Sequence, residues 1–174
     1  MKDVEIRELY KFEETIANFC GSKYAIAVDC GTNAIFLALS FYKYYETIKI
    51  PKNTYIGVYS AIKMANKNVV FEDISWEKMY TLKPTNIYDS ACWFDKNMYI
   101  PNSIMCLSFS YKKRLPIGRA GAILTDNVLF RDWCIMARNL GKDISKPLSE
   151  QQYNFIGWNM ILHPELAKKG IELM

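Results

Sequence analysis

One stretch decides the fold: YAIAVDCGTNAIFLAL, residues 24–39. Its first five residues are apolar and strand-sized, the turn 29–33 contains a glycine, and the apolar run 34–39 is helix-sized. A strand that is apolar along nearly its whole length is typical of one buried on both faces. The order strand, glycine turn, helix therefore predicts the first unit of an α/β domain.

The same alternation continues on both sides of that stretch. Upstream, an amphipathic helix ending at Gly21 is indicated by apolar residues at helical spacing: Leu9, Phe12, Ile16 and Phe19. Downstream, strands are predicted at 48–51, 69–73, 86–89, 103–109 and 121–125, and helices at 54–65, 127–140 and 165–173. Strands alternating with helices imply right-handed crossovers, so we expect an α/β fold with a mostly parallel sheet and helices on both faces.

Length and composition indicate one domain, which we expect to span residues 1–174. With 51% hydrophobic and 23% charged residues, the chain is not of the disordered class. Its longest apolar runs, such as 104–109, are strand-sized, so no membrane segment is predicted. The net charge of +4 mildly suits an anionic ligand and does not establish nucleic-acid binding, which stays open.

The amino terminus and the cysteines favour a cytoplasmic location. Residues 1–5 carry two acids and no apolar stretch behind a basic residue, so no secretory signal is predicted. The five cysteines form an odd set without a C-x-x-C pair, and we expect them to be reduced and mostly buried. Because His163 is the single histidine, no histidine-rich metal site is predicted.

Two places suggest contacts to an anion and to a cation. Gly31, Thr32 and Asn33 connect a strand to a helix, where a tight turn, a hydroxyl and the helix amino end suit a phosphate. The alternative is a plain turn with Thr32 as the helix cap. Asp89 follows a strand at the edge where open α/β sheets bind ligands, and its carboxylate suits a protonated ring nitrogen. The alternative is a cap or turn residue.

A third place combines hydroxyls with an amine nucleophile. The segment from Ser108 to Arg114 contains Lys112 and Lys113 at the end of a predicted strand. Neighbouring cations lower the pKa of a lysine from about 10.4, which favours its neutral, nucleophilic form. A solvated basic loop is the alternative. Asn154 and Asn159 lie beside aromatic residues, a pattern that usually indicates a turn.

Together these motifs resemble the DegT-type family of pyridoxal-phosphate (PLP) aminotransferases, fold-type-I enzymes that commonly aminate nucleotide-linked keto sugars. The resemblance runs through most of the chain. The matching segments are 12–28, 30–35 for S-G-T-x-A-L, 50–55 for P-x-x-T-F/W, 70–73, 108–113 for S-F-x-x-x-K, 118–121 for G-x-G-G, 138–141 for R-N-H-G and 157–159 for G-x-N-Y-R.

The resemblance implies a role for each site residue. Lys113, rather than Lys112, would form the Schiff base with PLP, because its distance from Ser108 matches the family motif. Asp89 would pair with the pyridinium nitrogen, and Tyr55 would stack on the ring.

The phosphate and the dimer follow from the same resemblance. The turn at Gly31, the Thr32 hydroxyl, the Asn33 N–H and Ser108 would hold the phosphate. Asn159 would reach the phosphate of a neighbouring subunit, which implies a homodimer with shared active sites.

The chain also departs from the family. Cys92 stands where the family has a Gln or His that touches the phenolic oxygen of the cofactor. Between Asp73 and Asp89 there are 15 residues, where the family has further strands and helices. The chain ends at Met174, where the family continues into a second domain. We therefore expect a minimal fold-type-I large domain that lacks the C-terminal small domain.

The leading functional hypothesis is a PLP-dependent aminotransferase. It would move an amino group from a small-molecule donor to a keto group on a nucleotide-linked sugar or other phosphorylated small molecule, through a Schiff base at Lys113. One alternative is a partner-dependent or non-catalytic PLP-binding fragment. Another is a PLP enzyme that modifies a nucleotide or a nucleic-acid base, which the charge favours weakly.

Overall fold

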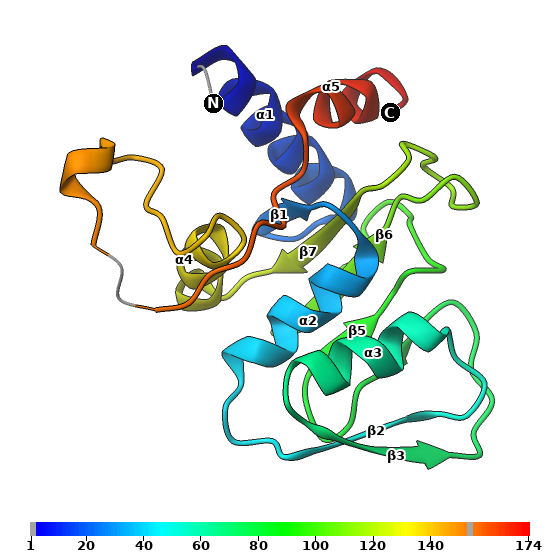
Figure 1. The fold of residues 1–174 in the computed structure, drawn as a ribbon. Coiled ribbons are helices and arrows are strands. Elements are labelled where there is room, and N and C mark those ends of the chain that lie inside the picture. The colour runs from blue at the N-terminus through cyan, green and yellow to red at the C-terminus, as the bar shows by residue number, and fades with distance from the viewer. Residues whose placement is uncertain (1–2, 153–154) are drawn as a thin grey trace.

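The computed structural model describes residues 3–152 and 155–174. Helices and strands alternate along the chain up to residue 72, and four further strands then follow one another without a helix until residue 128 (Figure 1). The helices are α1 (Asp3–Cys20), α2 (Gly31–Phe41), α3 (Ile56–Met64), α4 (Val128–Ala137) and α5 (Pro164–Glu172), with a short 3-10 helix, η1 (Leu148–Glu150). The strands are β1 (Tyr24–Val28), β2 (Thr47–Pro51), β3 (Asn68–Glu72), β4 (Tyr80–Thr81), β5 (Ile87–Asp89), β6 (Ile104–Ser108) and β7 (Gly121–Thr125). The α/β class is confirmed.

The strands form a mixed sheet and a parallel pair. The main sheet has the order β1-β7-β6-β5-β4, in which β5 and β6 are parallel and the other pairs antiparallel. Strands β2 and β3 pair in parallel, and an antiparallel bridge joins Lys49 of β2 to Lys83 just after β4. Of the seven strands in the described ranges, all but β4 and β7 thus share one direction. Strand β7 follows β6 through residues 109–120 and pairs with it antiparallel.

Helices cover both faces of the main sheet, as the alternation predicts (Figure 1). Along β1, Ile26 and Val28 point into one apolar core, while Ala25 and Ala27 point into another. The first core is closed by α2, α3 and α4, and the second by α1 and α5. Full burial of one aliphatic side chain stabilises the fold by about 1.5–3 kcal/mol, so the two cores hold the layers together.

Helix α1 follows the predicted apolar stripe. Leu9, Phe12 and Ile16 are fully buried, and Phe12 packs edge-on against Phe109 at a ring distance of 5.9 Å. The helix ends at Cys20, and Gly21, which follows it, has a φ of +81°, a left-handed conformation that glycine adopts at little cost.

A buried ion pair ties α1 to β1 and to the end of α4. Arg138 follows α4 and donates to the carboxylate of Glu13 in α1 and to the carbonyl of Ala27 in β1. The Ala27 N–H donates back to Glu13 Oε1 at 2.8 Å. Arg138 is fully buried, so this contact lies inside the core.

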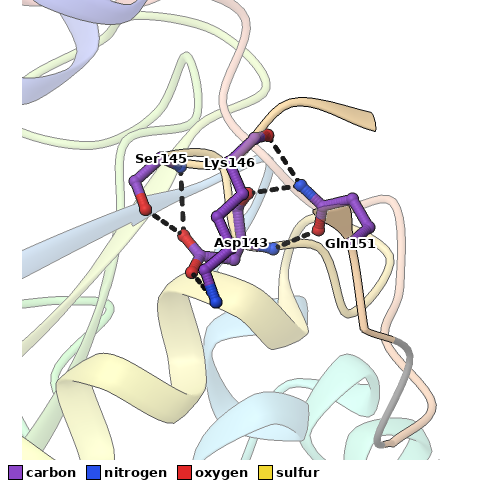
Figure 2. Close-up of polar contacts among 4 residues, drawn as sticks. All are labelled: Asp143, Ser145, Lys146 and Gln151. Carbon is purple, nitrogen blue, oxygen red and sulfur yellow. Dashed lines mark hydrogen bonds and ion pairs between the residues drawn. The ribbon is translucent and has the colours of Figure 1, made fainter. Parts of the chain in front are cut away.

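The loop after α4 is organised by one glutamine (Figure 2). The Gln151 side chain accepts from the Asp143 N–H at 2.9 Å and donates to the carbonyls of Asp143 and Lys146. Asp143 in turn accepts from the Ser145 N–H and hydroxyl. These bonds close the loop locally before the chain enters α5.

Within the described residues, no helix has both the length and the apolar character needed to cross a membrane.

Candidate functional site

A cavity of about 530 Å³ opens at the carboxyl ends of β5 and β6 and beside the amino end of α2. This is the edge at which open α/β sheets bind ligands. Its lining comes from five parts of the chain: Cys30, Gly31, Thr32 and Ile35; Thr54, Tyr55 and Val58; Trp76; Asp89, Ala91 and Cys92; and Ser108, Ser110, Lys112 and Lys113.

The amino end of α2 lies directly on the end of β6. A Cβ at Gly31 would meet the Cβ of Ser108 at 2.9 Å and the carbonyl oxygen of Leu107 at 3.2 Å, so glycine permits this approach. The cap of α2 is Cys30, whose sulfur accepts the Asn33 N–H at 3.4 Å. Thr32 therefore lies inside the first helical turn, and the alternative of Thr32 as the cap was wrong. Its hydroxyl lines the cavity beside a helix amino end, which favours anions.

Asp89 is the buried acid of the site, with 6% of its surface exposed. Its Oδ1 accepts the Ala91 N–H at 3.0 Å, and its Oδ2 accepts the Tyr80 hydroxyl at 2.8 Å. Burial raises the pKa of Asp89 above its ordinary value. The two hydrogen bonds and the charge of Lys113 oppose that rise. The arrangement therefore strongly favours a cationic partner on the cavity side of Asp89.

Lys113 is the better-placed of the two neighbouring lysines. It is half-buried, whereas Lys112 is exposed, although both line the cavity. Its Nζ donates to the sulfur of Cys92 at 3.5 Å. Cys92 is an exposed free thiol, in contrast to the buried Cys106. Cys92, at which the sequence departs from the family motif, thus contacts Lys113, the predicted Schiff-base lysine.

The aromatic side of the cavity lies at the start of α3. Tyr55 precedes that helix and is 71% exposed, and a Cβ at Gly57 would meet the Tyr55 ring at 2.5 Å and the Thr32 Oγ1 at 2.8 Å. Tyr55 and Thr32 therefore both lie close to Gly57. The helix begins at Ile56 rather than at the predicted residue 54.

Most predicted site residues meet in the cavity. Its lining includes Gly31, Thr32, Tyr55, Asp89, Cys92, Ser108 and Lys113.

Two predicted residues lie outside that lining. The Asn33 side chain donates to Asp29 Oδ1 at 2.7 Å, and exposed Asn159 pairs with Asn139 in an isolated bridge. Since Asn159 was assigned to a neighbouring subunit, its position in one chain leaves that prediction untested. Asn154 lies outside the described residues.

Sequence reasoning missed Tyr80, Trp76 and the site contact of Thr54. Tyr80 donates to Asp89 and shares a hydrogen bond with the Thr54 hydroxyl. The Trp76 ring packs against Tyr80 at 4.8 Å, and its Nε1 donates to the Asn53 carbonyl at 2.9 Å. The two-residue strand β4 was too short for a periodic signal.

Solved structures share this fold. DesV from S. venezuelae has a TM-score of 0.80 at 18% identity, over 95% of this chain and 56% of its own. The sugar aminotransferase CalS13 from Micromonospora echinospora has a TM-score of 0.78 at 14% identity, over 95% of this chain and 59% of its own. NtdA from Bacillus subtilis, solved with bound cofactor PMP, has a TM-score of 0.76 at 18% identity, over 95% of this chain and 47% of its own.

These likenesses confirm the expected α/β fold, which the chain shares with solved aminotransferases. This chain spans about half the length of the three proteins, between 47% and 59%. No curated protein is significantly similar to it in sequence. Residues 6–90 match the sequence model of the DegT/DnrJ/EryC1/StrS aminotransferase family, and the family resemblance read from the motifs is thereby confirmed.

Proposed function

We propose that this chain binds PLP and acts as an aminotransferase, with Lys113 as the lysine that holds the cofactor covalently. One observation carries the proposal: Lys113, Asp89, Thr32 and Ser108 line a single cavity although they come from three separate segments of the chain. An amine, a buried carboxylate and two hydroxyls beside a helix amino end are the groups that such a cofactor needs. The match of residues 6–90 to an aminotransferase family supports the same conclusion.

The residues present fit PLP. Gly31 lets the first turn of α2 approach Ser108, so hydroxyls and helix N–H groups converge where a phosphate would be held. Each carboxylate oxygen of Asp89 already accepts one hydrogen bond, and the carboxylate would hold a proton on the ring nitrogen. Tyr55, exposed beside Thr32, offers a ring to stack on. When bound, PLP supplies an electron sink for the carbanion formed at the substrate's α-carbon.

The chain's own residues then position the substrate and move protons. The Lys113 amine would take the α-proton and, as the ammonium, return it. Cys92, 3.5 Å from Lys113 Nζ, would orient that amine. Asp89 would keep its negative charge while a protonated ring nitrogen faces it, because burial makes that charge costly without a facing cation.

We propose a keto group on a nucleotide-linked sugar, or on another phosphorylated small molecule, as acceptor. The similarity to the sugar aminotransferase CalS13 supports this substrate class. Arg119 pairs with Asp29 at 3.0 Å and Arg114 with Asp95 at 3.1 Å, so their charges are partly compensated. Lys112 lines the cavity and is the cation we assign to a substrate phosphate.

We further propose a homodimer with shared sites, in which exposed Asn159 reaches the partner's phosphate. The cytoplasmic location expected from the sequence stays a prediction.

A second candidate is a PLP-binding chain that needs a partner to become active. It is favoured by one observation: the chain spans about half the length of its solved relatives.

Absorption spectroscopy separates the two. We expect the chain, loaded with PLP and freed of excess, to show a visible band that shifts when glutamate is added. A stable band without any response to amino acids would favour the binding chain. No band at all would contradict both proposals.

A further inference from the structure

A hydrogen-bonded chain lies directly behind Asp89. Antiparallel pairing of β4 with β5 places Tyr80 opposite Asp89, and the Tyr80 hydroxyl donates to Asp89 Oδ2 at 2.8 Å. The other carboxylate oxygen accepts the Ala91 N–H at 3.0 Å. Each oxygen of the buried carboxylate therefore has one donor, and the tyrosine supplies the side-chain donor.

The number of available protons fixes which hydroxyl donates in each of these hydrogen bonds. A tyrosine hydroxyl has one proton, and Tyr80 uses it toward Asp89. The Thr54 hydroxyl, which also contacts the Tyr80 oxygen, must then donate to it. Donors aligned from Thr54 through Tyr80 end on the Asp89 carboxyl group, and such hydrogen bonds are stronger when the acceptor is ionised.

The packing holds Tyr80 in this position. Its side chain is 6% exposed, and the Trp76 ring lies against it at 4.8 Å. Trp76 is itself anchored to the Asn53 carbonyl at 2.9 Å, next to Thr54. Thr54, Trp76 and Asp89 line the cavity, whereas Tyr80 stands behind them. Tyr80 therefore acts on a ligand through the cavity residues that it contacts, among which Asp89 is the charged one.

We propose that Tyr80 is a positioning residue which keeps Asp89 ionised and aimed into the cavity, an inference that rests on the proposed function of Asp89 as partner of the cofactor's ring nitrogen. Without Tyr80, Oδ2 would lose its donor on a carboxylate with only 6% of its surface exposed.

Other titratable groups surround Asp89. Lys113 faces it across the cavity and favours its charged form. Buried Cys106 of β6 lies close enough to feel its charge, and Cys92 lies near Tyr80. Burial itself raises the pKa of Asp89, and the Tyr80 hydrogen bond lowers it. Since none of these other groups is altered in Tyr80→Phe, a change in the Asp89 titration reports the lost hydroxyl.

The test is a pH titration of Asp89 in the cofactor-free protein. Carboxyl ¹³C NMR of protein labelled at its aspartates monitors the titration. Asp89→Asn identifies the resonance. In Tyr80→Phe the midpoint should rise by about one pH unit or more, the size expected when a buried carboxylate loses one of two donors. The matched control is Tyr88→Phe, the same change at the neighbouring residue of β5, whose side chain packs in the other core. An unchanged Asp89 midpoint in Tyr80→Phe would overturn the inference.

Two further measurements complete the test. If Tyr80→Phe fails to fold, Thr54→Val removes the donor to Tyr80 and should raise the midpoint in the same direction by less; no rise would count against the inference. With ¹⁵N-labelled PLP bound, the ring-nitrogen resonance of Tyr80→Phe should move toward the unprotonated position, and a wild-type position would contradict the role. If wild-type protein binds no PLP, the proposed function fails, while the cofactor-free titration still decides whether Tyr80 controls Asp89.

Discussion

Lys112 and Lys113 are adjacent, and both line the cavity, but their surroundings differ. Lys113 is half-buried and contacts Cys92, whereas Lys112 is exposed. After loading with PLP and reduction with borohydride, we expect peptide mapping to find the label on Lys113. Lys113→Ala should abolish labelling, and Lys112→Ala, the matched control, should retain it. Label on Lys112 would refute the assignment.

Asp89 should make stability depend on pH in an unusual sense. Burial raises its pKa in the folded chain above the ordinary value of 3.8. Below 3.8, Asp89 is protonated in both the folded and the unfolded chain, and above the raised pKa its buried charge opposes folding. Relative to Asp89→Asn, the cofactor-free wild type should therefore lose stability as the pH rises through this window.

The loss amounts to about 1.4 kcal/mol for each pH unit by which burial displaces the pKa. Urea unfolding of both proteins in steps from pH 7 to pH 4 measures it, and effects of groups that do not interact with Asp89 cancel in the difference. A difference that stays constant over this range would show that Asp89 titrates normally.

At the scale of elements, the buried pair of Arg138 and Glu13 joins α1, β1 and the end of α4. Removing one partner of a buried pair leaves an uncompensated charge, which costs about 3–5 kcal/mol. Arg138→Met should therefore lower the free energy of unfolding by about that amount. Replacing both residues, as Glu13→Leu with Arg138→Met, should recover much of the loss.

The recovery expected when both Glu13 and Arg138 are replaced has a structural reason. Within the described residues, Arg138 Nε and Nη2 are buried without a hydrogen-bond partner, so the pair is incompletely satisfied. Urea unfolding of the single and double variants decides the matter. If the double variant is as unstable as Arg138→Met, the ion pair itself, rather than the orphaned charge, provides the stability.

The elements also show how far sequence reasoning reaches. Residues 24–39 predicted β1, the glycine turn and α2, because apolar periodicity and a required glycine are local signals. The thiol cap at Cys30 escaped prediction because cysteine is not among the usual capping residues. Tyr80 escaped because its contact with Asp89 depends on pairing between strands, which no local pattern encodes. The antiparallel β7 likewise depends on how a long loop returns to the sheet.

At the scale of the whole molecule, the cavity is open on one side. Tyr55, which lines it, is 71% exposed, and the chain spans between 47% and 59% of its solved relatives. A second copy would cover this side if the sites are shared, as the assignment of exposed Asn159 to the partner's phosphate requires.

Subunit mixing tests that arrangement. Lys113→Ala and Asn159→Ala proteins should each lack the glutamate response of loaded wild type, the first for want of the covalent lysine and the second through weaker phosphate binding. In a mixed dimer, one site regains both residues, so random exchange should restore about one quarter of all sites. Mixing Lys113→Ala with a variant that carries both Lys113→Ala and Asn159→Ala is the control and should restore none, because every site then lacks the lysine. No recovery in the first mixture, together with a monomeric mass by light scattering, would show that each chain builds its site alone.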